Sequence, residues 1–166
     1  MSAAGLDLIL DAPAADLPAA VAVMHRAFAE YARTGTPSGA MLETAPSLLA
    51  EREDGVRVAL ARRDGTVVAM VKHQDAADGS RYFGRLAVDP GQRGRGVARA
   101  LIEALRDDAL RAGRSGLTCL VRADEHRAIA FYQALGMVVE GSGERVSRTG
   151  ATIRVVEMAD PRARTV

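Results

Sequence analysis

A run that mixes glycine with arginine occupies the middle of the 166-residue chain: Asp89-Pro90-Gly91-Gln92-Arg93-Gly94-Arg95-Gly96-Val97-Ala98. It follows a β-rich segment and precedes a segment with helical spacing. Glycines allow successive backbone N–H groups to converge, and the start of a helix adds about half a positive charge. Arg93, Arg95 and Arg99 surround this point with cations. The run therefore predicts an anion site, and phosphate is the favoured anion.

Two common phosphate-binding motifs do not match this run. A nucleoside-triphosphate loop has the form G-x-x-x-x-G-K-[ST], and Gly91 and Gly96 have its spacing, but Val97 and Ala98 replace the lysine and the hydroxyl. A dinucleotide fold needs G-x-G-x-x-G, and Arg99 stands where the third glycine belongs. A plain surface turn with solvated arginines stays open as an alternative at this point.

The segment Arg93-Gly94-Arg95-Gly96-Val97-Ala98 resembles the acyl-CoA loop R/Q-x-x-G-x-G/A of the GNAT acetyltransferase superfamily. Leu86-Ala87-Val88-Asp89-Pro90 resembles the strand that precedes this loop in the family. Ala128-Ile129-Ala130-Phe131-Tyr132-Gln133-Ala134-Leu135-Gly136-Met137 is similar to the family helix motif A-I-x-x-Y-x-x-x-G-F. Both motifs occur in the family order, and with the element order the resemblance covers nearly the whole chain.

The resemblance implies that acetyl-CoA is the co-substrate and that no metal takes part. The pantetheine arm is expected beside the strand before the loop, pairing with backbone at Leu86 and Val88, and the pyrophosphate is expected on the loop. Arg93 is then expected at the entry and Arg99 near the phosphates. The full set of expected CoA-binding residues is Leu86, Ala87, Val88, Arg93, Gly94, Arg95, Gly96, Val97, Ala98, Arg99, Glu125, Ala128 and Phe131.

The same resemblance places Tyr132 beside the thioester sulfur as the general acid. When a neutral amine attacks a thioester, a thiolate must leave, and a phenol with a pKa of about 10 can protonate it. The alternative is that Tyr132 is an aromatic residue of the core, because it shares a helix face with apolar residues.

The general base is less clearly marked. Many family members carry a carboxylate on the strand before the loop, but Arg81–Val88 contains none. Glu43 is the candidate base, and a solvated loop carboxylate is its alternative. Two further departures from the family pattern are Glu125 in place of an asparagine and Met137 in place of a phenylalanine.

Other reactive side chains suggest no second chemistry. His25, His73 and His126 lack the spacing of metal ligands. An exposed position at the end of a strand is expected for His73, and a position at the border of the acceptor pocket is its alternative. Cys119 lies in an apolar run, which predicts an inert buried thiol. With one cysteine in the chain, we expect a cytoplasmic protein without disulfides.

The net charge of +1 argues against a nucleic-acid partner. No apolar run approaches the roughly 18 residues of a membrane span, so no membrane partner is expected either.

The elements that must position these residues follow from hydrophobic periodicity. The pattern predicts one α/β domain over 1–166 with a mixed, mostly antiparallel sheet of about seven strands, one parallel and splayed pair, and about four flanking helices. Strands are expected at Leu6–Leu10, Val56–Ala61, Val67–His73, Arg81–Val88, Gly116–Val121, Met137–Gly141 and Thr152–Met158. Helices are expected at Asp16–Ala32, Ser47–Glu53, Gly96–Ala112 and Ala123–Leu135.

Together these features predict an acetyl-CoA-dependent N-acetyltransferase in which a primary amine attacks the thioester directly in a ternary complex. The acceptor is a small-molecule or peptide amine that the sequence does not identify, and a homodimer is an open expectation. Two alternatives remain, a non-catalytic acyl-CoA-binding or sensing module and a protein-interaction domain.

Overall fold

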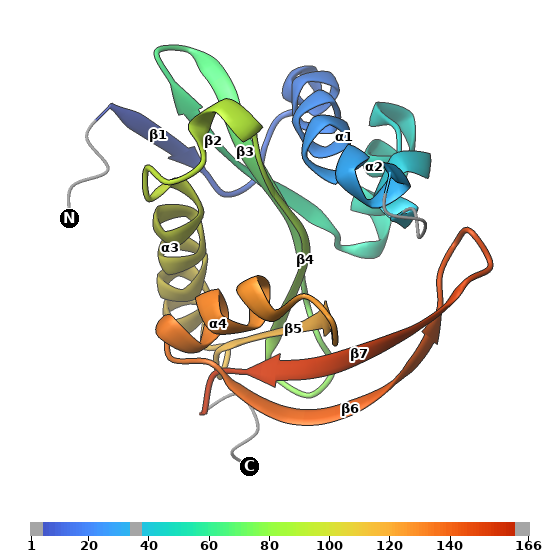
Figure 1. The fold of residues 1–166 in the computed structure, drawn as a ribbon. Coiled ribbons are helices and arrows are strands. Elements are labelled where there is room, and N and C mark those ends of the chain that lie inside the picture. Colours follow the sequence, from blue (N-terminus) through green and yellow to red (C-terminus); the bar gives the residue numbers. More distant parts are fainter. Residues whose placement is uncertain (1–4, 34–37, 162–166) are drawn as a thin grey trace.

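A computed structural model describes residues 5–33 and 38–161 of the chain. Seven strands form one sheet in the order β1-β2-β3-β4-β5-β7-β6, with α1 and α2 on one face and α3 and α4 on the other (Figure 1). The strands are β1 Leu6–Ile9, β2 Arg57–Arg63, β3 Thr66–Asp75, β4 Arg81–Val88, β5 Leu117–Arg122, β6 Val138–Val146 and β7 Thr152–Ala159. The helices are α1 Leu17–Arg33, α2 Ala45–Glu51, α3 Val97–Arg111 and α4 His126–Ala134. The fold class predicted from the sequence is confirmed.

Local sequence explains where several elements begin and end. Asp64 and Gly65 both have positive φ, 52° and 79°, as a two-residue turn between β2 and β3 requires. Helix α2 begins at Ala45, two residues before the predicted start, because Thr44 and Ser47 form a reciprocal capping box. Helix α4 is followed by Gly136 with a φ of 92°, which confirms it as the residue that ends the helix.

The sheet separates two apolar cores. One lies under α3 and α4, and it includes the predicted inner face of α3, namely Val97, Leu101, Leu105 and Ala109. The other lies under α1 and α2 and includes Val21 and Met24, with Phe28 partly buried against it. Tyr31, predicted on the same face of α1, has a side chain outside the described residues. The predicted loop Thr34–Pro46 is described from Ser38 onward, where Gly39–Leu42 form a short 3-10 helix, η2.

Strands β4 and β5 form the one parallel pair among the described strands, and they stay together for two residue pairs, Arg81↔Leu117 and Tyr82↔Thr118. Beyond Thr118 they diverge, while β5 continues its pairing with β7 on its other edge. The predicted parallel, splayed pair is therefore present. The divergence opens the middle of the sheet at the C-terminal end of β4.

Strand β4 also carries a bulge at this point. Met70 of β3 pairs with Ala87 and Lys72 pairs with Gly84, so Arg85 and Leu86 together oppose the single residue Val71. Arg85 has a φ of 59°, and no other residue of β4 has a positive φ. A left-handed conformation at a residue with a side chain costs of the order of 1–3 kcal/mol, so the surrounding structure must hold it.

The C-terminal hairpin is longer than predicted. Strand β6 runs to Val146 rather than ending at Gly141, because its second half pairs with β7 as far as Val146↔Thr152. The glycines at 141 and 143 hide this extension from a reading of β propensity. None of the described helices is long and apolar enough to cross a membrane. The described residues also contain no cluster of His, Cys, Asp and Glu that could hold a metal ion.

Candidate active site

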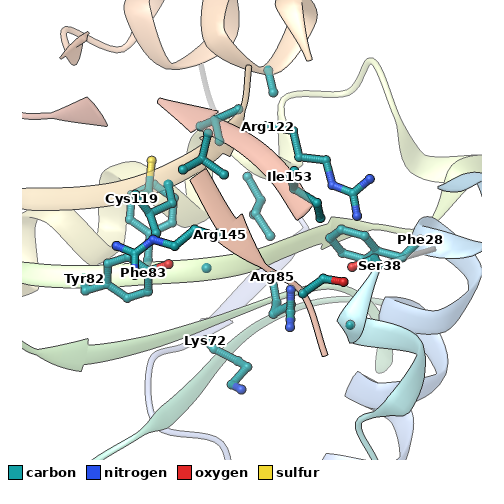
Figure 2. A pocket seen from close by; sticks show the side chains of 18 of the residues that line it. Phe28, Ser38, Lys72, Tyr82, Phe83, Arg85, Cys119, Arg122, Arg145 and Ile153 are labelled. Carbon is teal, nitrogen blue, oxygen red and sulfur yellow. The ribbon is translucent and has the colours of Figure 1, made fainter. Parts of the chain in front are cut away.

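A cavity of about 500 Å³ opens where β4 and β5 separate. Figure 2 shows side chains from both strands, from α1 and from the β6–β7 hairpin around it. The residues that line it include Tyr82, Arg85, Leu86, Cys119, Ala128 and Tyr132. Residues from the two halves of the sheet thus meet at one place.

The backbone of β4 offers hydrogen bonds to this gap. The N–H of Asp89 donates to the carbonyl of Val68 on β3, at 2.8 Å. Because backbone groups of a strand point alternately to its two edges, Leu86 and Val88 direct theirs toward the diverging β5. An extended ligand with amide groups, such as a pantetheine arm, fits such an edge in the manner of an added strand.

The glycine–arginine run leads into α3 through two glycines in the left-handed region. Gly94 and Gly96 have φ values of 79° and 77°, and a Cβ atom added at either would meet no atom within 4 Å. Gly96 caps α3 without a side-chain hydrogen bond, as a glycine must. The start of a helix carries N–H groups without partners inside the helix, so the anion site stays a prediction for this position.

The arginines of the run are exposed and lie outside the cavity. Arg93 forms an ion pair with Glu30 of α1 at 2.8 Å, and Arg99 forms one with Glu103 of α3, also at 2.8 Å. Arg95 is exposed. A ligand that joins this run to the cavity must therefore be long, with its anionic end at α3 and its other end between β4 and β5.

Tyr132 is a residue of the core and also a residue of the cavity wall. It is 7% exposed and belongs to the core under α4, yet it also lines the cavity. Its ring packs edge-on against Phe83 and Phe131, with centroid distances of 5.5 and 5.2 Å. Ala128 and Glu125 line the cavity too, whereas Phe131 supports Tyr132 from the side. The packing fixes the phenol at the cavity wall.

Cys119 lines the same cavity, so a thiol nucleophile has to be considered. Burial, with a smaller contribution from the charge of Asp160, raises the pKa of the thiol to about 12. A thiol with such a pKa stays protonated near neutral pH, and the protonated form is a poor nucleophile. The predicted inert thiol is consistent with this environment.

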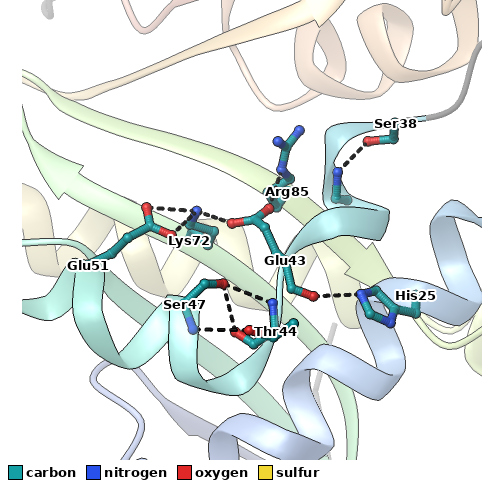
Figure 3. A network of polar contacts seen from close by, with 9 residues as sticks. His25, Ser38, Glu43, Thr44, Ser47, Glu51, Lys72 and Arg85 are labelled. Carbon is teal, nitrogen blue, oxygen red and sulfur yellow. Dashed lines mark hydrogen bonds and ion pairs between the residues drawn. The ribbon is translucent and has the colours of Figure 1, made fainter. Parts of the chain in front are cut away.

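Glu43 is buried, and both of its carboxylate oxygens bind cations. Figure 3 shows Lys72 on one oxygen and Arg85 on the other, the latter at 2.7 Å, while Lys72 also pairs with Glu51 at 3.0 Å. Burial alone raises the pKa of Glu43, but the hydrogen bonds and charges of Lys72 and Arg85 outweigh it and lower the pKa below its ordinary value. A solvated loop carboxylate, the alternative interpretation, is wrong. The geometry also argues against Glu43 as a base, because its lone pairs are occupied and its proton affinity is reduced.

His73 differs from expectation as well. An exposed position was predicted, but the residue is 7% exposed and its Nε2 lies 2.7 Å from the carbonyl oxygen of Leu10. Burial lowers the pKa of His73, and the cation of Arg81 adds to this, so the imidazole is neutral near pH 7. The buried position depends on β1, which lies far away in the sequence.

The sequence did not single out the cations around the cavity. Lys72, Arg85, Arg122, Arg145 and Arg148 line it, against two lining carboxylates, Glu51 and Glu125. Lys72 carried a usable signal, since it is the single lysine of the chain and stands in an apolar strand. The arginines did not stand out in a chain whose other cations are all arginine.

The curated relatives that match are acetyltransferases. Over 74 residues the chain is 36% identical to the ribosomal protein bS18-alanine N-acetyltransferase of Escherichia coli K12, covering 45% of this chain and 49% of that protein. Over 77 residues it is 38% identical to an acetyltransferase of Yersinia pestis Pestoides F, covering 46% and 53%. The chain thus spans about half the length of the curated relatives it matches.

Solved structures match over nearly the whole chain. The ribosomal-protein-S18-alanine N-acetyltransferase of E. coli superposes with a TM-score of 0.74 at 24% identity, covering 95% of this chain and 94% of that one. The ribosomal-protein-alanine N-acetyltransferase of Brucella melitensis gives 0.73 at 22%, covering 92% and 98%. A Salmonella typhimurium protein solved with its cofactor acetyl-CoA gives 0.72 at 18%, covering 93% and 92%. At these identities the likeness shows the fold.

The family comparison is broader than either curated match. The model of the acetyltransferase (GNAT) family matches residues 22–137, which include most of α1, the bulged strand, the glycine–arginine run and α4. This match covers more than half of the chain and agrees with the motifs, the sheet order and the splayed parallel pair. The chain belongs to the acetyltransferase (GNAT) family.

Proposed function

We propose that this protein transfers an acetyl group from acetyl-CoA to a primary amine by direct attack in a ternary complex. The observation that carries the proposal is the continuity of three features: an anion-binding run at α3, an open backbone edge on β4, and a buried tyrosine at the end of the gap. The curated relatives, which are N-acetyltransferases or acetyltransferases by name, support it.

The residues divide the work along the length of the co-substrate. The N–H groups that follow Gly96 hold the pyrophosphate, and the open edge at Leu86 and Val88 holds the pantetheine arm. Acetyl-CoA supplies the activated acetyl group when bound. The N–H of Val88 is our candidate for polarising its carbonyl oxygen.

The transfer needs one proton on sulfur and releases one from nitrogen. The amine nitrogen forms a bond to the carbonyl carbon, the carbon–sulfur bond breaks, and Tyr132 donates its phenolic proton to the leaving thiolate. The nitrogen loses a proton to water, and Tyr132 regains one from solvent. Direct attack is favoured over an acyl-enzyme on Cys119, because that thiol is protonated at neutral pH.

The test combines binding with turnover. Isothermal calorimetry with acetyl-CoA measures the affinity, and release of free CoA is followed over a panel of amino acids, peptides, polyamines and aminoglycosides. Binding together with acceptor-dependent CoA release supports an enzyme. Tight binding without CoA release for any amine would support the rival interpretation, a sensing module. Absence of binding would exclude acetyl-CoA as the co-substrate.

Three further points are proposals of the same standing. The one sheet that joins β1 to β7 supports a single catalytic domain over 1–166. The single cysteine supports a cytoplasmic location, which fractionation tests. The exposed valines of β6, Val138, Val139 and Val146, support a homodimer, which analytical ultracentrifugation tests.

A further inference from the structure

Arg85 is held through its Nε, and among the described residues no hydrogen bond or ion pair involves its two terminal nitrogens. Its Nε donates to Glu43 at 2.7 Å, and Glu43 is fixed in turn by Lys72. The terminal nitrogens point away from Glu43 (Figure 3), and Arg85 lines the cavity. A guanidinium that keeps both terminal nitrogens available presents a planar fork, and this fork matches a carboxylate bidentately.

Around this fork the cavity has an excess of positive charge. Lys72 and Arg85 are balanced by Glu43 and Glu51, so this network is close to neutral. Beyond the network, Arg145 and Arg148 line the cavity, and within the described part of the chain neither has an ion pair. Figure 2 shows Arg145 and Arg85 among the side chains that line the cavity. An anionic group is the natural partner for such surroundings.

We propose that the acceptor is a free α-amino acid, whose carboxylate binds the terminal nitrogens of Arg85 while its amine faces the thioester near Tyr132. This assignment rests on the proposed acetyl transfer and adds the class of acceptor to it. Glu43 is then a positioning residue that aims Arg85, and the left-handed backbone of Arg85 is the cost of placing its side chain there.

The closeness of two loops above the cavity favours a small acceptor. A Cβ atom at Gly39 of η2 would lie 3.0 Å from Nη2 of Arg85 and 3.4 Å from Cβ of Arg148. The loop between β6 and β7 therefore approaches η2 directly over the fork. The cavity of about 500 Å³ must also hold the acetyl end of the co-substrate, so the acceptor shares this volume with it.

The positive surroundings also bear on the missing base. An ammonium group placed among arginines is destabilised relative to the neutral amine, so its pKa falls. The acceptor then releases its proton to water before attack, and no dedicated carboxylate is required on β4. The absence of a carboxylate from Arg81–Val88 and the excess of cations in the cavity have one explanation.

The experiment compares amino acids with the same molecules lacking the carboxylate. CoA release is measured for L-leucine and isopentylamine, L-phenylalanine and phenethylamine, and L-histidine and histamine. An amidated peptide that begins with alanine represents a protein acceptor. We expect at least one amino acid to exceed its partner amine in kcat/KM by about ten- to hundredfold, the usual range for charge-assisted hydrogen bonds.

Two variants assign the preference to Arg85. Arg85→Gln removes the guanidinium fork. Arg85→Gly also removes it but adopts the left-handed backbone without strain, so a comparison of the two variants distinguishes loss of binding from a folding defect. Both should raise KM for the amino acid by a much larger factor than KM for the partner amine. Arg111→Gln, an exposed charge change at the far end of α3, is the matched control.

The outcomes separate the two proposals. Amines acetylated equally with and without a carboxylate, or a clear preference for the peptide, overturn the amino-acid assignment and leave the acetyltransferase intact. Equal loss with both partners in the Arg85 variants also overturns it. Failure of every amine to release CoA overturns the proposed function itself.

Discussion

Tyr132 packs in the core and is our proposed general acid, and a single substitution separates these two roles. Tyr132→Phe keeps the ring that packs against Phe83 and Phe131 and removes only the hydroxyl. We expect kcat to fall by roughly 10²- to 10⁴-fold, the range for loss of general acid catalysis, with the affinity for acetyl-CoA nearly unchanged. Steady-state kinetics and calorimetry measure the two quantities.

The matched control for this prediction is Tyr82→Phe, which removes the same hydroxyl from another tyrosine of the same cavity. Its kcat should change far less. Equal turnover of wild type and Tyr132→Phe would return Tyr132 to a purely structural role in the core.

Glu43 makes stability depend on pH. Its folded-state pKa lies below the ordinary 4.5, so the stabilisation is complete above that pH and is lost as the pH falls through the folded value. Glu43→Gln removes this titration and leaves Arg85 without its anion, at a cost of about 3 kcal/mol near neutral pH. Urea unfolding at several pH values should therefore show the wild-type advantage shrinking as acid is added.

Glu103→Gln is the control for the acid dependence. Glu103 also pairs with an arginine, Arg99, but it is half exposed, and such pairs contribute about 0–1 kcal/mol. If the difference in unfolding free energy between wild type and Glu43→Gln stayed constant down to pH 3, this result would contradict the proposed role of the buried carboxylate.

At the scale of elements, the run before α3 offers a matched pair of glycines. Gly96 and Gly113 flank the two ends of α3, have φ values of 77° and 80°, and have no atom within 4 Å of an added Cβ. Valine at either position costs a similar backbone strain of about 1–2 kcal/mol. Gly96→Val should abolish acetyl-CoA binding in calorimetry, because its branched side chain enters the space proposed for the pyrophosphate, and Gly113→Val should bind normally. Equal affinities would remove the run from the site.

The elements also show what local sequence can reveal. The turn at Asp64-Gly65 and the inner face of α3 depend on short-range spacing, and both were predicted correctly from it. The burial of His73 was not, because its partner Leu10 lies 63 residues away. The bulge at Arg85 was also missed, since a left-handed arginine has no signal in a β-rich segment.

The charged network behind the cavity was only half predicted. Glu43 was selected as a base through the family resemblance, but its burial and its two cations are set by α2, β3 and β4 packing together. Such long-range contacts cannot be derived from spacing. The burial of Tyr132 could be, because it depends on the apolar face of one helix, α4.

At the scale of the whole molecule, the two residue pairs between β4 and β5 form a narrow seam between the halves of the sheet. A ligand arm that hydrogen-bonds along β4 adds contacts where the strands themselves have none. At a concentration 100 times its dissociation constant, acetyl-CoA should stabilise the fold by about 2.7 kcal/mol. Differential scanning calorimetry should show that acetyl-CoA raises the Tm of wild type and of Gly113→Val. The Tm of Gly96→Val should not change when acetyl-CoA is added.

The narrow seam has a mechanical consequence. Because only two residue pairs join β4 to β5, the two halves of the sheet can move relative to each other more easily than strands that pair along their whole length. A ligand bound across the opening restricts this motion. Acetyl-CoA is such a ligand, so the sheet should be more rigid when the co-substrate is bound and more mobile after CoA leaves. Hydrogen exchange at Leu86 and Val88 is expected to slow on loading and to recover on release. In each catalytic cycle the sheet would then become more rigid as acetyl-CoA binds and more mobile as CoA leaves, so the co-substrate that is consumed is also a temporary part of the folded structure.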